Sequence, residues 1–513
     1  MAGRTRTTVA LVGAGVGGLA AAARLAAQGF AVRVVEKGDG PGGRCGRIER
    51  AGFRFDLGPT LLLMPEVFAE TFAVCGRRID DYLALVRCDP NYRIHFGDGS
   101  HVTFTTELTR MAAELERIEP GSVPRYLRFL AQGAVQYRTS VDHFVGRNFD
   151  HLGQFLTPAN LRRVLRVRAH RFMYPEVGRW FRDERLRAAL SFQTMYLGIS
   201  PFEAPAVYGL LPYTELAMGI WYPQGGMYQV PLALERLCGE LGVEIEYGSA
   251  VERIVVEQGR ATGLALAGGR RIAADVVLCN ADLPWAYKHL IDPRETALPR
   301  AKRLRYTSSA YMMYLGLDRR VPELEHHNVF FGGDYRASFE DIFHRHRLPN
   351  DPSFYVNVAA RTDASVAPAG RDGLYVLVPA PHRAPGQDWQ VDGQRIREHV
   401  LARLARVGCG DVARHVVTET HLTPADWETR LNLDLGSAFG LSHDFFQVGP
   451  FRPANQDRLI RNLFFVGAST QPGTGLPMVL LSARLVTERI AAFAGPQPGV
   501  LGAAVARAAE SAA

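Results

Sequence analysis

The residues near the N-terminus that could do chemistry are three glycines, Gly13, Gly15 and Gly18, in the spacing G-x-G-x-x-G. They follow an apolar run over residues 8–12 and precede an alanine-rich stretch, as in a turn between a strand and a helix. The first glycine of such a turn permits the tight bend, the second lets the backbone approach a pyrophosphate, and the third lets the helix pack on the strand. A second apolar run ends at Glu36, whose carboxylate can accept hydrogen bonds from ribose hydroxyls. The stretch therefore predicts a dinucleotide-binding turn, with NAD and FAD both left open.

Two further motifs follow this turn and narrow the choice of cofactor. One is Gly42-Gly43-Arg44, and the other is the aromatic alternation over residues 52–56, which leads into Gly58-Pro59-Thr60. Together they resemble the flavin-dependent family of amine oxidases and carotenoid desaturases, in which the second glycine pair and its arginine contact FAD. The resemblance implies FAD as the cofactor. It also implies that the FAD contacts include Gly13, Gly15, Gly18, Glu36, Lys37, Gly43, Arg44, Gly58, Pro59 and Thr60.

A second pattern of strand, glycine turn and helix lies near the C-terminus, over residues 462–478. Pro477 is well placed for the first turn of that helix, whose free N–H groups would point at the flavin ring or the pyrophosphate. Many flavoproteins have an acid directly after the residue equivalent to Gly467. This chain has Ala468, so that a ribityl contact must come from the backbone or from Ser469. The residues that the resemblance assigns to FAD here are Gly467, Ala468, Gly475, Leu476, Pro477 and Met478, with Val251 beside the adenine.

Residues 221–227, 360–382 and 435–444 resemble the phytoene desaturase branch of this family. That resemblance implies an enzyme that introduces conjugated double bonds into a long apolar carotenoid, by hydride transfer to FAD and loss of a proton. The chain shows no Ser/His/Asp order, no Walker loop and no His or Cys cluster with metal-ligand spacing, so no metal is expected and the cofactor is assigned the chemistry. Asp444 and His443 are the candidate proton acceptors, with Glu215 behind them.

Two segments of unusual composition concern the substrate. Residues 198–227 are aromatic, apolar and nearly free of charge, and their prolines disfavour a long core helix, so that they are either buried core or the lining of an apolar tunnel. Residues 161–187 contain nine arginines and three acids, a local net charge of +6, with apolar residues between them. A basic amphipathic stretch of this kind can lie in a membrane interface. The alternative is a solvated helix face; nucleic acid is not expected, because no recognition motif accompanies the charge.

The elements that position these motifs predict an α/β fold, in which a Rossmann-type FAD-binding domain is interleaved with an α+β substrate domain and a helical, membrane-associating region. Residues 92–104 predict a hairpin, and residues 108–118 predict an amphipathic helix. The FAD-binding domain is expected over residues 1–90, 229–290 and 456–495. The substrate domain is expected over residues 91–228, with the basic helical region at about 125–190, and over residues 291–455. Residues 496–513 are expected to be a frayed tail.

The totals limit the class of protein. The chain has 513 residues, 47% of them hydrophobic, and six cysteines without a C-x-x-C pair, as in a protein of a reducing compartment. The net charge of +7 favours anionic partners such as lipid headgroups. No apolar run reaches the roughly 18 residues of a membrane span, and the first strand begins too early for a signal peptide. We therefore expect a cytoplasmic protein that is peripherally associated with a membrane.

Several functions stay open from the sequence. A carotenoid isomerase, a hydroxycarotenoid desaturase or a diapocarotenoid desaturase would share these motifs. An amine oxidase would need an aromatic cage beside the flavin and usually a cysteine linked to the ring, which the C-terminal motif lacks. A non-catalytic lipid escort on the same fold would have lost the glycines that are intact at Gly13, Gly15 and Gly18. The electron acceptor is expected to be a quinone or oxygen, and the sequence gives no oligomeric state.

Overall fold

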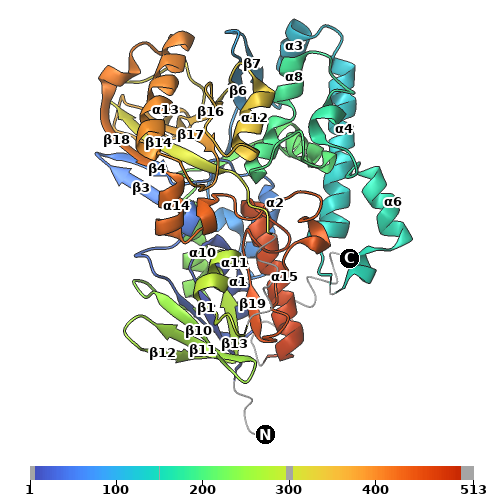
Figure 1. Cartoon of the computed structure of the whole chain (residues 1–513), viewed down its shortest axis with the longest axis vertical. Coiled ribbons are helices and arrows are strands. Elements are labelled where there is room, and N and C mark those ends of the chain that lie inside the picture. The colour runs from blue at the N-terminus through green and yellow to red at the C-terminus, as the bar shows by residue number, and fades with distance from the viewer. Residues whose placement is uncertain (1–5, 150, 296–303, 498–513) are drawn as a thin grey trace.

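The structure is a computed structural model that describes residues 6–149, 151–295 and 304–497. Figure 1 shows a parallel sheet with its helices in the lower half of the molecule and a larger sheet in the upper half, with a group of helices beside the larger sheet.

The lower half is built on a five-stranded parallel sheet with the order β19-β13-β1-β2-β9. Its strands β1, β13 and β19 are apolar and mostly buried, as expected for a parallel sheet that is covered on both sides. After β1 the chain adds β2 and β9 on one side of it, and later adds β13 and β19 on its other side. This reversal of strand order makes the carboxyl end of β1 a topological switch point, where ligands of such sheets bind. The strands are β1 (Thr8–Val12), β2 (Ala31–Val35), β9 (Glu244–Glu246), β13 (Val276–Cys279) and β19 (Leu463–Phe465).

Helices cover one face of this sheet and a small antiparallel sheet covers the other. On the first face α1 (Val16–Ala27) packs between α10 (Gln229–Glu240) and α15 (Leu476–Ala494), and small alanine side chains allow the close approach. On the second face, apolar residues of the parallel sheet pack against the antiparallel sheet and against α11 (Leu283–His289). The strands of that antiparallel sheet are β10 (Val251–Glu257), β11 (Arg260–Leu266) and β12 (Arg271–Ala273).

The upper half contains a seven-stranded sheet with the order β18-β14-β17-β16-β15-β6-β7, in which only β15 and β6 pair in parallel. Strand β14, which lies between β18 and β17, is buried along its whole length. Helix α13 (Trp389–Leu404) covers one face. The strands are β6 (Tyr92–His95), β7 (His101–Phe104), β14 (Ser309–Leu317), β15 (His327–Phe330), β16 (Phe354–Asn357), β17 (Gly373–Ala380) and β18 (Val416–Leu422).

Beside this sheet lies a helical group that contributes its own core of aromatic and aliphatic side chains. Its helices are α3 (Leu108–Ile118), α4 (Val123–Ser140), α5 (Leu152–Phe155), α6 (Pro158–Arg166), α7 (Met173–Val177), α8 (Glu184–Ala189) and α9 (Leu210–Tyr213). Helix α6 projects from the body of the molecule in Figure 1. The remaining elements are β3 (Arg47–Arg50), β4 (Phe53–Asp56), α2 (Pro65–Ala73), β5 (Leu85–Arg87), β8 (Trp221–Pro223), α12 (Tyr335–Phe343) and α14 (Pro424–Leu431).

The architecture confirms the predicted α/β fold with an interleaved second region. The predicted hairpin is β6 and β7, paired antiparallel, and the predicted amphipathic helix is α3. The residue boundaries assigned to the domains stay a prediction, and most of the expected tail lies outside the described residues. Among the described residues, no helix combines the length and the apolarity needed to cross a membrane.

Candidate functional site

A cavity of about 930 Å³ is lined by residues from both halves of the molecule. Of the seventeen residues that the sequence assigns to FAD, sixteen line it. The exception is Gly18, where an added Cβ would lie 2.3 Å from the carbonyl oxygen of Gly13, so that this glycine serves the packing of α1 on β1. The sixteen are Gly13, Gly15, Glu36, Lys37, Gly43, Arg44, Gly58, Pro59, Thr60, Val251, Gly467, Ala468, Gly475, Leu476, Pro477 and Met478.

The two glycine-rich turns present the starts of two long helices to this cavity. Helix α1 begins after Gly15 and α15 after Gly475, and neither N-terminus is capped by a side chain. Backbone N–H groups at uncapped helix starts favour an anion. At Gly15 a Cβ would lie 2.7 Å from Nδ2 of Asn280, and at Gly475 it would meet nothing within 4 Å. The start of α1 at Gly15 therefore offers a close backbone site for phosphate groups, and the start of α15 at Gly475 faces open space.

Glu36 and Lys37 lie at the edge of the first turn. The carboxylate of Glu36 accepts hydrogen bonds from the N–H groups of Ala14 and Gly38, each at 2.8 Å. Lys37 donates to the side-chain oxygen of Asn432 at 2.9 Å, and partial burial lowers the pKa of its ammonium group. Each oxygen of Glu36 keeps a further lone pair, so that its role toward a ribose hydroxyl stays compatible with these bonds.

Arg44 faces a buried acid that sequence reasoning missed. Its Nη1 donates to the carbonyl oxygen of Ala438 at 3.2 Å, and burial lowers the pKa of the guanidinium while Asp282 opposes that shift. Asp282 accepts from the Ser469 hydroxyl at 2.5 Å, and burial raises the pKa of its carboxyl group. Asn280 and Asp282 follow β13 as Glu36 follows β2. Their position directly after a strand of the predicted parallel sheet is the sequence feature from which both could have been predicted.

The part of the cavity that lies away from the glycine turns has an apolar wall. Leu210 and Leu211 of this wall come from the charge-poor segment 198–227. Of the two roles predicted for that segment, buried core or cavity lining, these residues have the second. The carboxylates that line the cavity are Glu36, Glu252 and Asp282, all from the nucleotide side, and among the described residues the apolar wall has none. Further side chains of this wall are Phe192, Met195, Leu197, Val329, Phe331, Tyr335, Phe339, Ile342 and Phe354.

The structure separates the two candidate proton acceptors. His443 lines the cavity, but its Nε2 accepts the N–H of Thr474 at 3.0 Å, and burial holds the pKa of the imidazole well below its usual range. Asp444 does not line the cavity: one carboxylate oxygen accepts from the N–H of Phe446 at 2.9 Å, and the other lies 3.9 Å from the Arg305 guanidinium. The geometry therefore gives the assignment of Asp444 no support, because the neighbouring turn holds its carboxylate.

Glu215 lies behind the wall and does not line the cavity. It is fully buried, and its carboxylate accepts hydrogen bonds from Tyr92 and from Gln193. Burial raises the pKa of Glu215 to about 7, against the lowering effect of hydrogen bonds that include one from Tyr196. Since Tyr196 does line the cavity, Glu215 reaches the site only through another side chain.

Comparison with known proteins supports a flavin site in this cavity. The family model described as flavin containing amine oxidoreductase matches residues 16–491. A zeta-carotene-forming phytoene desaturase of Myxococcus xanthus is 62% identical over 490 residues, which cover 95% of each chain. The chain belongs to the phytoene desaturase family of flavin containing amine oxidoreductases.

Two further comparisons concern a second relative and the fold. An all-trans-zeta-carotene desaturase, also of Myxococcus xanthus, is 37% identical over 96% of this chain and 95% of that protein. The solved structure of an oxidoreductase from Methanosarcina mazei has a TM-score of 0.62, at 18% identity, over 94% of this chain and 100% of that chain. That structure shows the shared fold. The cofactor of the protein is FAD, for which the two uncapped helix starts and the open glycine cradle are a suitable set of contacts.

Proposed function

We propose that the protein is an FAD-dependent carotenoid desaturase that converts phytoene to zeta-carotene. The observation that carries the proposal is one cavity that joins two uncapped helix starts to an apolar wall without a carboxylate among the described residues. Such a wall suits an uncharged hydrocarbon and disfavours an amine, which a buried carboxylate would have to neutralise. The zeta-carotene product is supported by the 62% identity to the zeta-carotene-forming enzyme, against 37% to the enzyme named for desaturating zeta-carotene.

The chain's own residues would bind, orient and shield the reactants. When bound, FAD supplies the hydride acceptor. We assign the starts of α1 and α15 to the phosphates and the ring of the cofactor, and Arg44 and Thr60 to its remaining polar contacts. The apolar wall would hold the polyene and exclude water. Positive charge that develops on the substrate would be stabilised by the faces of aromatic rings, of which Phe331 and Tyr335 are examples.

For the proton that leaves the substrate, we propose a group other than the two that the sequence suggested. His443 could accept it at Nε2 only by releasing the N–H of Thr474, which follows Gly473 in the second glycine turn. We therefore assign His443 to positioning that turn, and Asp444 to the adjacent loop. We assign the proton instead to Asp282, a buried acid that lines the cavity, since burial raises the pKa of its carboxyl group.

We also propose that the protein docks on a membrane, from which the substrate enters. Five large apolar side chains are exposed around α5 and α6, namely Leu152 (47%), Leu156 (67%), Leu161 (63%), Leu165 (53%) and Phe172 (56%). We call these residues, with the exposed Arg162 and Arg166, the α5–α6 surface. Val141 and Val145, in the π-helical turn that follows α4, line the cavity and lead along the chain toward α5. A membrane at this surface would also bring a quinone within reach as electron acceptor, with oxygen as the alternative.

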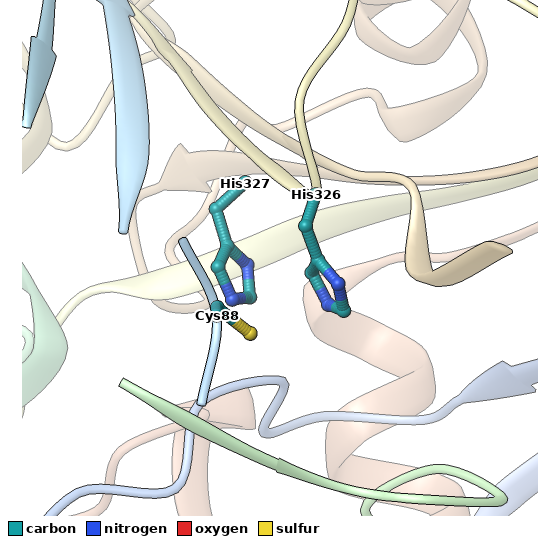
Figure 2. A group of neighbouring side chains, drawn as sticks. All are labelled: Cys88, His326 and His327. Carbon is teal, nitrogen blue, oxygen red and sulfur yellow. The ribbon is translucent and has the colours of Figure 1, made fainter. Parts of the chain in front are cut away.

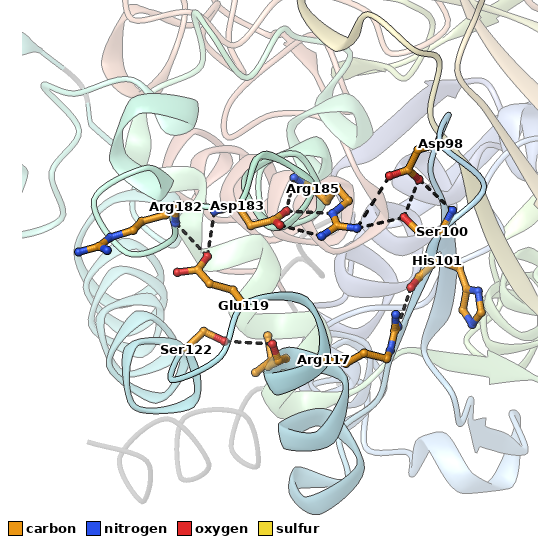
Figure 3. A network of polar contacts seen from close by, with 10 residues as sticks. Asp98, Ser100, His101, Arg117, Glu119, Ser122, Arg182, Asp183 and Arg185 are labelled. Carbon is orange, nitrogen blue, oxygen red and sulfur yellow. Dashed lines mark hydrogen bonds and ion pairs between the residues drawn. The ribbon is translucent and has the colours of Figure 1, made fainter.

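The arginines of segment 161–187 contribute less free charge than their number indicates. Arg168 and Arg171 both pair with the buried Glu176. Arg185 pairs with Asp183 and donates to Ser100, whereas the guanidinium of Arg182 points away from the network in Figure 3. We therefore expect membrane binding to depend more on the apolar side chains of the α5–α6 surface than on electrostatic attraction.

Expression in a bacterial host that accumulates phytoene tests the proposal. Extracted pigments, separated by chromatography and identified by their absorption spectra, should contain zeta-carotene. Lycopene as the main product would overturn the zeta-carotene assignment and keep the desaturase. Unchanged phytoene, with flavin bound to the purified protein, would overturn the desaturase and favour an isomerase or another carotenoid substrate.

A further inference from the structure

Three potential metal ligands that are far apart in the sequence meet inside the protein. Cys88, His326 and His327 are 2%, 5% and 1% exposed, and one ligand atom from each lies within 4.8 Å of the other two. Figure 2 shows the two imidazole rings side by side with the thiol next to them. Cys88 directly follows β5, and His327 is the first residue of β15. Within the residues that the structure describes, no other group of His, Cys, Asp and Glu meets the same criterion.

The hydrogen bonds around the two histidines leave one nitrogen of each ring without a partner. Nδ1 of His326 lies 2.6 Å from the hydroxyl of Thr362, and Nδ1 of His327 lies 2.6 Å from the hydroxyl of Tyr355. Asn357 makes a longer contact, 3.3 Å, with the same nitrogen of His327. Nε2 of both rings is buried and has no hydrogen-bond partner. Metal-bound histidines typically show this arrangement, since a bond at one nitrogen fixes the tautomer and orients the lone pair of the other.

A purely structural role explains this arrangement poorly. Leaving a buried polar nitrogen unsatisfied costs about 1–3 kcal/mol, and two such nitrogens lie together here. Apolar side chains of similar size would fill the same space without that cost. The hydroxyl of Thr362 also hydrogen-bonds Cys88, so that a single side chain orients two of the three candidate ligands.

We propose that Cys88, His326 and His327 form a structural site for a divalent cation of the zinc class. A thiolate with two imidazoles suits Zn²⁺, which takes sulfur and nitrogen ligands and tolerates a fourth position filled by water. Binding releases the thiol proton, and the thiolate neutralises one of the two positive charges of the ion. The expectation that the chain binds no metal would then be wrong at this site, because the ligands come together only in the folded chain.

The ion would fix the part of the molecule that supports the wall of the cavity. It would join the chain after β5 to the start of β15 in the seven-stranded sheet. The hydroxyl of Tyr355, which bonds His327, also lies 2.9 Å from the hydroxyl of Thr60, and both Tyr355 and Thr60 line the cavity. The ion itself would have no contact with substrate, so that it is independent of the proposed reaction.

Metal analysis of the purified full-length protein tests the proposal. The wild type, expressed with zinc in the medium and desalted, should contain one Zn²⁺ per chain when its metal content is measured by inductively coupled plasma mass spectrometry. Cys88→Ser and His326→Gln should lose most of it. Cys409→Ser, at another buried free cysteine, should keep it. No metal in the wild type, and no uptake when it is refolded with Zn²⁺, would overturn the proposal, as would equal zinc in Cys88→Ser and in Cys409→Ser.

A second measurement keeps the proposal testable if these variants fold poorly. The wild type refolded with Co²⁺ should show a thiolate-to-cobalt charge-transfer band, which a site made only of oxygen or nitrogen ligands lacks. Treatment with a strong chelator should lower the unfolding temperature, and added Zn²⁺ should restore it, at constant flavin content. A cobalt spectrum without the sulfur band, or an unfolding temperature that does not respond to the chelator, would contradict the site.

Discussion

The carboxylate of Glu36, at the end of the second strand of the parallel sheet, accepts a hydrogen bond from the N–H of Ala14 inside the first glycine turn, at 2.8 Å. Its other oxygen accepts from the N–H of Gly38, also at 2.8 Å. The acid therefore joins two consecutive segments of the cofactor side, in addition to the role toward ribose that we propose for it.

Replacement of Glu36 by glutamine should weaken cofactor binding. An amide presents only one oxygen, so that one of the two backbone N–H groups meets an NH₂ donor and loses its hydrogen bond, at a cost of about 1–2 kcal/mol. We expect roughly a tenfold loss of FAD affinity, measured by titrating apoprotein with FAD. Glu257→Gln, at an exposed position of β10, is the matched control and should bind as the wild type does. Equal affinity of both variants would contradict a role for Glu36.

Replacement of Gly15 by leucine should abolish flavin binding while the fold is kept. The new side chain would start 2.7 Å from Nδ2 of Asn280 and extend into the cavity. The ratio of flavin absorbance to protein absorbance of the purified variant measures the loss, and far-UV circular dichroism reports the fold. Gly239→Ala in α10 is the control. A Cβ there meets nothing within 4 Å, and the change should keep the flavin and stabilise the helix by about 0.5–1 kcal/mol. Persistent yellow colour in Gly15→Leu would show that the turn does not hold the phosphates.

Replacement of Glu215 by glutamine should change how stability depends on pH. Burial raises the pKa of this carboxyl from 4.5 to about 7, so that the folded state binds more protons than the unfolded state between these values. The stabilisation is fully present below pH 4.5 and is lost as the pH rises to about 7. At about 1.4 kcal/mol per unit, the variant should exceed the wild type by up to roughly 3 kcal/mol above pH 7.

Denaturant unfolding of both proteins from pH 4 to pH 8 measures this difference. The free energy of unfolding of Glu215→Gln minus that of the wild type should grow across this range, since contributions from other groups cancel. Glu257→Gln should show no such trend. A constant difference would mean that Glu215 titrates in the folded protein as it does in the unfolded chain.

The double substitution Leu161→Asp with Leu165→Asp should reduce binding to membranes. Each leucine that inserts contributes about 1.5–3 kcal/mol, so that we expect at least a tenfold drop in the fraction that sediments with anionic liposomes. Val417→Asp, at a 49% exposed position on β18, is the control and should bind as before. Because Arg168 and Arg171 pair with Glu176 and we expect the apolar side chains to dominate, salt should reduce wild-type binding only modestly. Complete release by salt would contradict apolar insertion.

The sequence allowed prediction of features whose cause is local. Glycine spacing, apolar runs and a proline in the first turn of a helix depend on near neighbours, and sixteen of the seventeen residues assigned to FAD line one cavity. Gly18 is the exception for a physical reason, since the same motif requires it for packing. The fold class could therefore be inferred from these local patterns, whereas the flavin family and the type of enzyme followed from the resemblance of the motifs to a known family.

Features that depend on distant contacts could not be predicted in this way. Nothing in the spacing of Cys88 and His326 along the chain indicates that they meet, because the seven-stranded sheet brings them together. The sequence also placed Asp444 and His443 together as candidates, whereas the turn directs only His443 to the cavity. The net charge of residues 161–187 already included Glu176, but the sequence could not reveal that this acid is buried and pairs with Arg168 and Arg171.

The order of strands in the parallel sheet has a consequence for how the protein is made. Strand β1 is the first of the chain and lies at the centre, but β19 and α15, which complete the sheet and the second helix start, come from the last part of the described chain. During translation the flavin site therefore cannot be completed until almost the whole described chain has been synthesised. Until then the nascent chain would expose the apolar faces of β1 and α1, to which chaperones can bind. For the same reason, a C-terminal truncation that removes β19 and α15 should abolish flavin binding.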